Sequence, residues 1–265
     1  MTEPDRHFDP SRGFRLDGQV CLVTGGARGI GRGCGFALAR AGAHVHLLDR
    51  DGDAAEATAA EIVADGGTAT GHALDVTDED AIVARFDAIA AAEGRIDALV
   101  NNAGMALRRP SVELPRADWD RVLEVNLSGV FLSARTAARH MLAEGARGGT
   151  IVNLASIMGL SGGGLYPNIS YQTTKGAVVN LTRALAVEWA PRIRVNAVAP
   201  TWVRTGFIAP LLARPDLVAK MESSMPLGRL AEVEEVAAAV LFLLSPAASM
   251  ITGHTLPVDG GFLAQ

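Results

Sequence analysis

The sequence predicts a single α/β domain: a doubly wound, mostly parallel sheet of seven strands with helices on both faces. Short apolar runs of strand length alternate along the chain with longer, alanine-rich segments of helical period. The strand runs are apolar at nearly every position, which is typical of strands buried on both faces. With 265 residues, of which 49% are hydrophobic, the chain is long enough for one such domain and short for two.

Each expected strand is followed by a helix or a loop that leads to the next strand. Gly42 and the Gly66–Gly67 pair end the first two helices. No linker or repeat divides the chain, so residues 16–265 are expected to be one domain after a tail of residues 1–15. The predicted strands are 19–24, 44–49, 68–74, 98–101, 150–155, 194–199 and 255–258, and the predicted helices are 30–41, 53–65, 79–93, 119–143, 171–189 and 233–244.

The composition argues against several classes of function. The net charge is −5 and no long Lys/Arg run occurs, so we expect no nucleic-acid partner. The sequence contains no stretch of 18 uninterrupted apolar residues, so no membrane-spanning helix is predicted. Residues 1–15 are polar and lack the apolar core of a signal peptide, which predicts a cytoplasmic protein.

No metal site is predicted. The six histidines show no grouping with cysteine of the kind that binds zinc, and Cys21 and Cys34 lie in apolar or helical patterns typical of structural thiols. His44 and His46 flank Val45 on one predicted strand. We favour a packing role for these two rings over a metal role.

A glycine-rich turn follows the first strand and predicts a dinucleotide site. Such a turn lets the backbone approach a pyrophosphate, and the helix start then offers free N–H groups and the positive end of a dipole. A bare turn would also explain the glycines, so the signal is weak on its own. The spacing is G-x-x-x-G-x-G, and the residues concerned are Gly25, Arg28, Gly29, Ile30 and Gly31.

Asp49, at the end of the second strand, is the second signal. A carboxylate there accepts hydrogen bonds from the adenosine ribose hydroxyls and repels a 2′-phosphate, which predicts NAD as the cofactor. Arg28 and Arg50 flank the same place and could offset the repulsion, so NADP is not excluded. The alternative is that Asp49 merely caps a helix or a loop.

Two further loops are expected on the same rim, because ligands of open parallel sheets bind beyond the carboxyl ends of the strands. Small residues and amides there suit an adenosine pocket lined by backbone. The loops hold Asp75 and Val76 after the third strand, and Asn102, Ala103 and Gly104 after the fourth.

Tyr171 and Lys175 indicate the chemistry. They are four residues apart at the start of a strong helix, so both side chains lie on one face. A nearby ammonium favours a phenolate and is expected to lower the pKa of the tyrosine towards the working pH, where a general acid/base is most effective. The only other tyrosine, Tyr166, lacks this partner, and the only other lysine is Lys220.

Ser156 and Asn126 are further candidates. Ser156 closes the fifth strand, where its hydroxyl could hydrogen-bond the reacting oxygen beside Tyr171. Asn126 lies in an otherwise apolar helix, and its amide needs a partner there. Satisfaction of a core amide explains Asn126 as well as a functional role does.

Residues 201–226 interrupt the alternation of strands and helices. The segment is long, carries Trp202 and Phe207, and is punctuated by Pro210 and Pro215. We expect it to be a mobile lid over the substrate, the alternative being a fixed pair of surface helices.

Together these motifs resemble the short-chain dehydrogenase/reductase family in its single-domain form, with a Rossmann-type fold. The resemblance runs from about Leu16 to Phe262. It implies that Tyr171 is the acid/base, that Ser156 orients the substrate oxygen, and that Lys175 holds the nicotinamide ribose and lowers the tyrosine pKa. It implies further that Asn126 anchors a water in a proton relay from Lys175, and that Val203 and Thr205 hold the carboxamide beside Pro200. Family members are commonly homotetramers packed through two long helices and the C-terminal strand.

Two departures from the family pattern concern the pocket. Pro200 is followed by Thr201 where the family usually has glycine, which puts the pocket width in doubt. The interval between Ser156 and Tyr171 is longer than in many members, which weakly resembles some polyol or sugar dehydrogenases.

The sequence therefore predicts an NAD(P)-dependent oxidoreductase that transfers a hydride between nicotinamide and a secondary alcohol or ketone, such as a small polyol, sugar or related hydroxy compound. Arg108 and Arg109 could instead grip a carboxylate, although a solvated loop is the interpretation we favour. The alternatives are a 3-oxoacyl-carrier-protein reductase, against which Asp49 speaks, and a non-catalytic dinucleotide-sensing protein, which the complete Ser/Tyr/Lys set disfavours.

Overall fold

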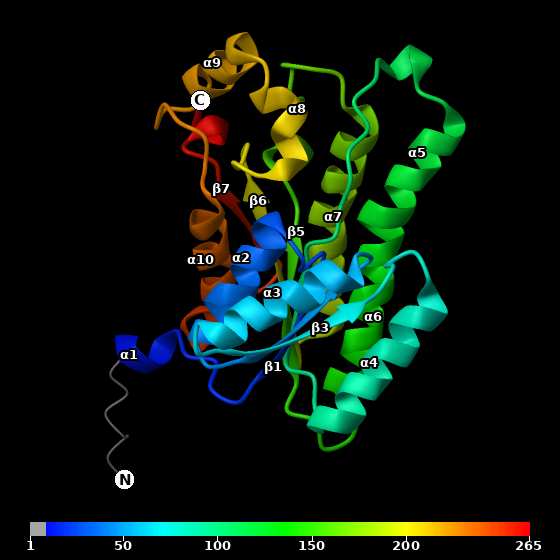
Figure 1. Cartoon of the computed structure of the whole chain (residues 1–265), viewed down its shortest axis with the longest axis vertical. Coiled ribbons are helices and arrows are strands. Elements are labelled where there is room, and N and C mark those ends of the chain that lie inside the picture. Colours follow the sequence, from blue (N-terminus) through cyan, green and yellow to red (C-terminus); the bar gives the residue numbers. More distant parts are fainter. Residues whose placement is uncertain (1–8) are drawn as a thin grey trace.

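A parallel sheet of seven strands forms the centre of the molecule in the computed structural model, which describes residues 9–265 (Figure 1). The strand order is β3-β2-β1-β4-β5-β6-β7, and every neighbouring pair is parallel. The predicted sheet is confirmed, and each strand lies within one residue of its expected bounds. The strands are β1 (Val20–Thr24), β2 (His44–Asp49), β3 (Thr68–Ala73), β4 (Ala98–Asn101), β5 (Gly149–Leu154), β6 (Ile193–Pro200) and β7 (Thr255–Val258).

Helices cover both faces of the sheet, as expected for strands that are apolar throughout (Figure 1). Alternate residues of β2 divide between the two cores: Val45 and Leu47 pack on one side and Leu48 on the other. One layer holds α2 (Gly29–Arg40), α3 (Gly52–Ala64) and α10 (Val233–Leu244), and the other holds α4 (Glu79–Glu93), α6 (Gly129–Leu142) and α7 (Ile169–Glu188).

The helical tract predicted at 119–143 differs from the structure. It begins earlier, as α5 (Arg116–Leu123), and a π-helical segment (Glu124–Ser128) separates it from α6. Such single-turn π segments insert an extra residue into a helix and often occur at functional sites. Asn126 lies within this segment and bonds to another loop, which no local pattern in the sequence reveals.

Short elements complete the described chain. Residues 1–8 of the expected tail lie outside the described residues, and within its remainder α1 (Pro10–Gly13) was not predicted. The expected lid contains α8 (Ala209–Leu212) and α9 (Pro215–Ser223). The 3₁₀ turns are Ser111–Glu113, Ile157–Gly159, Gly206–Ile208, Pro246–Ala248 and Phe262–Ala264.

The strand order places a crevice at one edge of the sheet. The chain leaves β1 towards β2 on one side, and later elements add on the other side of β1, beginning with β4. Open parallel sheets bind ligands where the order reverses in this way, beyond the carboxyl ends of the strands. None of the helices within residues 9–265 is both long enough and apolar enough to cross a bilayer.

Close packing of α3 on β3 provides a test of the fold. A Cβ added at Gly71 would lie 2.3 Å from the backbone nitrogen of Glu56 and 2.4 Å from the carbonyl carbon of Ala55. Gly71→Ala should therefore lower the free energy of unfolding by about 1–3 kcal/mol in a urea titration. Gly162, around which a Cβ would meet nothing within 4 Å, is the control, and Gly162→Ala should change stability by less than about 0.5 kcal/mol. Equal losses in both variants would contradict this packing.

Candidate active site

A cleft of about 760 Å³ opens at the carboxyl ends of the strands. The loops that follow six of the strands, β1 to β6, line its walls, because parallel strands deliver their following loops to one edge. All but two of the predicted site residues are among the lining residues; the exceptions, Gly31 and Asn126, lie behind the wall. The predicted residues that line the cleft are Gly25, Arg28, Gly29, Ile30, Asp49, Asp75, Val76, Asn102, Ala103, Gly104, Ser156, Tyr171, Lys175, Pro200, Val203 and Thr205.

The glycine-rich turn has the tight geometry that its sequence predicts. Gly25 and Gly29 adopt positive φ angles of 63° and 55°. A Cβ at Gly31 would lie 2.1 Å from the carbonyl oxygen of Gly25, so Gly31 is required by the turn itself and not by contact with a ligand. The Asn102 amide donates to that same oxygen at 2.9 Å, and Arg28, which precedes α2, makes no side-chain cap. The first N–H groups of α2 are therefore not capped by the side chain of Arg28.

Asp49 lies at the end of β2 and lines the cleft, as expected. Its two carboxylate oxygens accept hydrogen bonds from the backbone N–H groups of Ala27 and Asp51, both at 3.1 Å. The carboxylate thus joins the glycine-rich turn to the loop after β2. This is the structural role that the sequence analysis gave as the alternative to a ribose contact. Arg28 forms an exposed ion pair with Asp51, next to the same rim.

Tyr171 and Lys175 lie together on the first turns of α7, within the cleft. Lys175 is only 4% exposed, and its Nζ donates to the backbone oxygen of Leu154 at the end of β5. The same Nζ lies 5.6 Å from the centre of the Tyr171 ring. Ser156, two residues beyond Leu154, lies beside the Tyr171 hydroxyl and lowers its pKa. The serine, tyrosine and lysine therefore converge, as the sequence analysis predicts.

The pKa of Tyr171 differs from the expectation. Burial raises it to about 12, and this outweighs the hydrogen bond from Ser156, which lowers it. Burial also lowers the pKa of Lys175 to about 8. The prediction that the Lys175 ammonium lowers the pKa of Tyr171 is wrong for the protein without a bound cofactor. Burial destabilises the phenolate more than the neighbouring groups stabilise it.

Asn126 is buried behind the cleft wall and has three hydrogen bonds. Its Oδ1 accepts from the backbone nitrogen of Met105 at 2.8 Å, and its Nδ2 donates to the oxygen of the same residue at 2.9 Å and to Thr174 Oγ1 at 3.2 Å. This amide fixes the loop after β4 against α7. A Cβ at Gly104 would lie 3.5 Å from Asn126 Oδ1 and 3.9 Å from Lys175 Nζ, so the loop passes close to both side chains.

The substrate end of the cleft holds aromatic side chains of the expected lid and of the interval between Ser156 and Tyr171, which the sequence analysis did not name as site residues. The Phe207 ring lies 6.0 Å from the Tyr171 ring, and Trp202 Nε1 donates to the Tyr166 hydroxyl at 2.8 Å. The aromatic residues of the expected lid could have indicated this wall, because they follow β6 at the same edge. Thr201 also lines the cleft, and its hydroxyl donates to the sulfur of Met225 at 3.1 Å.

Arg108 is a cation at this mouth. Its guanidinium carbon lies 5.6 Å from the ring centres of both Tyr166 and Phe207. Its Nε is buried without a hydrogen-bond partner in the described part of the chain. The neighbouring Arg109, in contrast, points to Asp118 at 3.8 Å and does not line the cleft.

Comparison with known proteins agrees with this geometry. The family model described as "Enoyl-(Acyl carrier protein) reductase" matches residues 25–263. The crystal structure of a short-chain type dehydrogenase/reductase from Mycobacterium marinum is 39% identical, with a TM-score of 0.91 over 96% of this chain and 98% of that one. This chain belongs to the short-chain dehydrogenase/reductase family.

Several similar members of the family have named substrates. A D-threitol dehydrogenase of Mycolicibacterium smegmatis is 44% identical over 94% of each chain. A cis-4-hydroxycyclohexanecarboxylate dehydrogenase of Sinomonas cyclohexanicum is 46% identical over 93% of this chain and 97% of the relative. A gluconate 5-dehydrogenase structure from Burkholderia cenocepacia, in complex with NADP and tartrate, is 35% identical with a TM-score of 0.92, over 97% of this chain and all of that one.

The role expected of Tyr171 in this dehydrogenase/reductase gives a first prediction. Tyr171→Phe should lower kcat at least about 100-fold, because it removes the proton that a general acid/base transfers. Cofactor affinity, measured by quenching of NADH fluorescence, should stay nearly unchanged. Tyr166→Phe is the control, since it makes the same chemical change in the same cleft, and it should retain turnover within about tenfold. Loss of cofactor binding in the Tyr171 variant would contradict the assigned role.

Lys175 gives a second prediction. Lys175→Arg keeps the positive charge but forces a larger, planar group into a buried site that holds a compact ammonium, so kcat/KM should fall at least about tenfold. Lys220→Arg, at the other lysine of the chain, lies exposed on α9 and should leave kcat/KM unchanged. Near-normal turnover of the Lys175 variant would show that charge alone is sufficient.

Proposed function

We propose that this chain is an NAD(P)-dependent dehydrogenase that transfers a hydride between nicotinamide and a secondary alcohol carbon of a small polyol, sugar or related hydroxy compound. The observation that carries the proposal is the convergence of Ser156, Tyr171 and Lys175 in one cleft with the glycine-rich turn. The substrates named for the relatives, a polyol and a hydroxy acid, support the same class.

The residues at the far end of the cleft fit a dinucleotide. The turn around Gly25 and Gly29 brings backbone close to the cleft, and α2 starts there without a side-chain cap, which suits a pyrophosphate. Asp49 supports NAD, through acceptance of ribose hydroxyls. The exposed Arg28 could face a 2′-phosphate, and a related gluconate 5-dehydrogenase holds NADP, so both cofactors belong to the proposal.

The proton steps follow from the chain's own residues. A bound nicotinamide would exchange the hydride and, when oxidised, bring a positive charge into the cleft. That charge would lower the pKa of Tyr171 from about 12, because a cation near a phenol favours its ionised form. Ser156 then holds the substrate oxygen, Tyr171 exchanges its proton, and the buried Lys175, with a pKa of about 8, can pass a proton onward. We propose that Asn126 holds the water that links Lys175 to solvent.

Arg108 favours a hydroxy acid within this substrate class. Its Nε is buried and unpartnered, and the guanidinium lies between the Tyr166 and Phe207 rings close to Tyr171. Its Nη2 donates to the backbone oxygen of Phe207 at 3.5 Å, so Nε keeps a free N–H group. A guanidinium is a strong site for a carboxylate, which it can bind with two parallel hydrogen bonds. We therefore prefer a carboxylate-binding role for Arg108 to the solvated loop that the sequence analysis favoured.

Two other functions remain as alternatives to test. A 3-oxoacyl-carrier-protein reductase should prefer NADPH and turn over a β-ketoacyl thioester. A dinucleotide sensor should bind NADH without turnover of any alcohol or ketone. A panel of polyols, sugars, hydroxy acids and a β-ketoacyl thioester, assayed with both cofactors, separates all three.

The lid, the assembly and the location also belong to the proposal. Trp202, Ile208, Leu217 and Met221 form an apolar cluster with Met158 at the cleft mouth, which supports a lid of residues 201–226. Large apolar side chains on α6 and α7 are exposed and support a homotetramer packed through these helices: Phe131, Leu142, Ile169 and Val187. A cytoplasmic location completes the proposal.

Cofactor choice gives a third prediction. Asp49→Ala removes the acceptor for ribose hydroxyls and the repulsion of a 2′-phosphate, so the ratio of kcat/KM with NAD to that with NADP should fall about tenfold or more. Asp53→Ala, an exposed carboxylate in the first turn of α3, is the control and should leave the ratio unchanged. An unchanged ratio in the Asp49 variant would count against the ribose contact.

The substrate class gives a fourth prediction. Arg108→Gln should raise KM for a hydroxy acid at least about tenfold and change KM for a neutral polyol of similar size much less, because only the acid loses an ion pair. Arg109→Gln, next along the chain but paired with Asp118, should affect both substrates equally little. If the Arg108 variant lost both substrates to the same extent, the carboxylate role would be wrong.

A further inference from the structure

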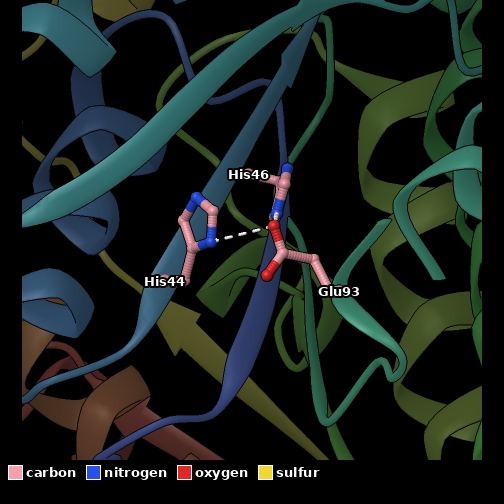
Figure 2. A group of neighbouring side chains, drawn as sticks. All are labelled: His44, His46 and Glu93. Atoms are coloured by element: carbon pink, nitrogen blue, oxygen red, sulfur yellow. Dashed lines mark ion pairs between the residues drawn. The ribbon is translucent and has the colours of Figure 1, made fainter. Parts of the chain in front are cut away.

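Three side chains converge at the end of the sheet opposite the cleft. His44 Nδ1 lies 3.0 Å and His46 Nε2 lies 3.3 Å from the same oxygen, Oε1 of Glu93 (Figure 2). The two histidines are the first and third residues of β2, whose other end carries Asp49, and Glu93 is the last residue of α4. None of the three lines the cleft, so the cluster belongs to no part of the proposed catalytic site.

The outer nitrogen of each imidazole is held by another side chain. His44 Nε2 lies 3.2 Å from Thr70 Oγ1, and His46 Nδ1 lies 2.9 Å from His72 Nε2. Both partners come from β3, the neighbouring strand. Metal-bound histidines in proteins typically have the second ring nitrogen held in this way, because the contact fixes the ring and selects the tautomer.

The inner nitrogen of His46 has no adequate partner. His46 is 4% exposed, and its Nε2 makes no hydrogen bond within the described residues, although it points at Glu93. A buried polar nitrogen normally finds a partner, and one without a partner calls for an explanation. A cation between this nitrogen and the carboxylate would satisfy both groups.

The distances fit a tetrahedral zinc ion. Zinc binds imidazole nitrogen and carboxylate oxygen at about 2.0–2.2 Å, which places neighbouring ligand atoms about 3.3 Å apart in a tetrahedron. The two distances to Glu93 Oε1 are 3.0 and 3.3 Å, and all three ligand atoms lie within 4.8 Å of one another. Small movements of side chains would therefore complete the geometry.

We propose that His44, His46 and Glu93 form a binding site for a divalent cation of the zinc type. The side chains of His44 and Glu93 are about one quarter exposed, at 25% and 24%, so water can supply the fourth ligand. The sequence favoured packing for these histidines because the carboxylate comes from a distant helix.

The site joins β2 to the end of α4, and bound metal should stabilise this region. Its formation requires the His46 proton on Nδ1, shared with His72 Nε2, so that Nε2 is free. The neutral His72 then carries its own proton on Nδ1, which faces Arg85 Nη1 at 3.3 Å, and Arg85 must turn away. Removal of this guanidinium should therefore strengthen metal binding.

Calorimetric titration of the full chain with Zn²⁺, after treatment with EDTA, tests the proposal. The wild type should bind one ion saturably and show a higher Tm with the metal, because binding stabilises the native state. His44→Gln and Glu93→Gln should each weaken zinc affinity at least about tenfold, and Arg85→Gln should strengthen it. Dehydrogenase activity should be the same in these variants, since the cluster lies away from the cleft.

A second histidine–carboxylate pair, which joins α6 to α4, is the matched control. His140 Nε2 lies 2.9 Å from Asp87 Oδ1, with no third ligand beside them in the described chain. His140→Gln should leave zinc affinity and the rise in Tm unchanged. Absence of saturable binding to the wild type, or wild-type affinity in both the His44 and the Glu93 variants, would overturn the proposal.

Discussion

A single buried ammonium connects the sheet, the long helix and the chemistry. Lys175 lies in α7 but donates to the backbone of Leu154 at the end of β5, so its position depends on how the helix packs on the sheet. Asn126 bonds both the loop after β4 and Thr174, the residue before Lys175. The proposed acid/base pair is therefore held by α7, by the end of β5 and by the segment that contains Asn126. Movement of any one of these elements would displace it.

The topology explains why the two ends of the proposed reaction meet. Parallel strands bring the loop of Gly25, the carboxylate of Asp49 and the serine after β5 to one edge, although they are far apart in sequence. The proposed cofactor end is lined by backbone and by charged side chains such as Asp49 and Arg28, whereas the proposed substrate end is lined by aromatic rings and Arg108. Substitutions at the substrate end can therefore change which substrate is accepted while the cofactor end stays the same.

Much of the fold and of the candidate site could be predicted because the signals are local. An apolar run followed by a glycine-rich turn, or a tyrosine four residues before a lysine, is visible in a short window of sequence. The π-helical segment around Asn126 could not be predicted, since Asn126 makes its hydrogen bonds to Met105 in a different loop.

The positions of Arg108 between two rings, and of Glu93 beside the histidines of β2, likewise depend on tertiary packing. The pKa of Tyr171 was expected in the wrong direction for a related reason. Spacing along a helix reveals a neighbouring charge but not the burial that opposes it.

The central claim is that burial keeps Tyr171 protonated and that the charge of the oxidised cofactor releases its proton. The chain has two tyrosines, so in the Tyr166→Phe variant the ultraviolet absorbance of phenolate reports Tyr171 alone. A pH titration of this variant should show no phenolate up to about pH 10 in the free protein, and ionisation at least roughly two pH units lower with saturating NAD⁺. Identical titration curves with and without NAD⁺, or phenolate at neutral pH in the free protein, would contradict the account.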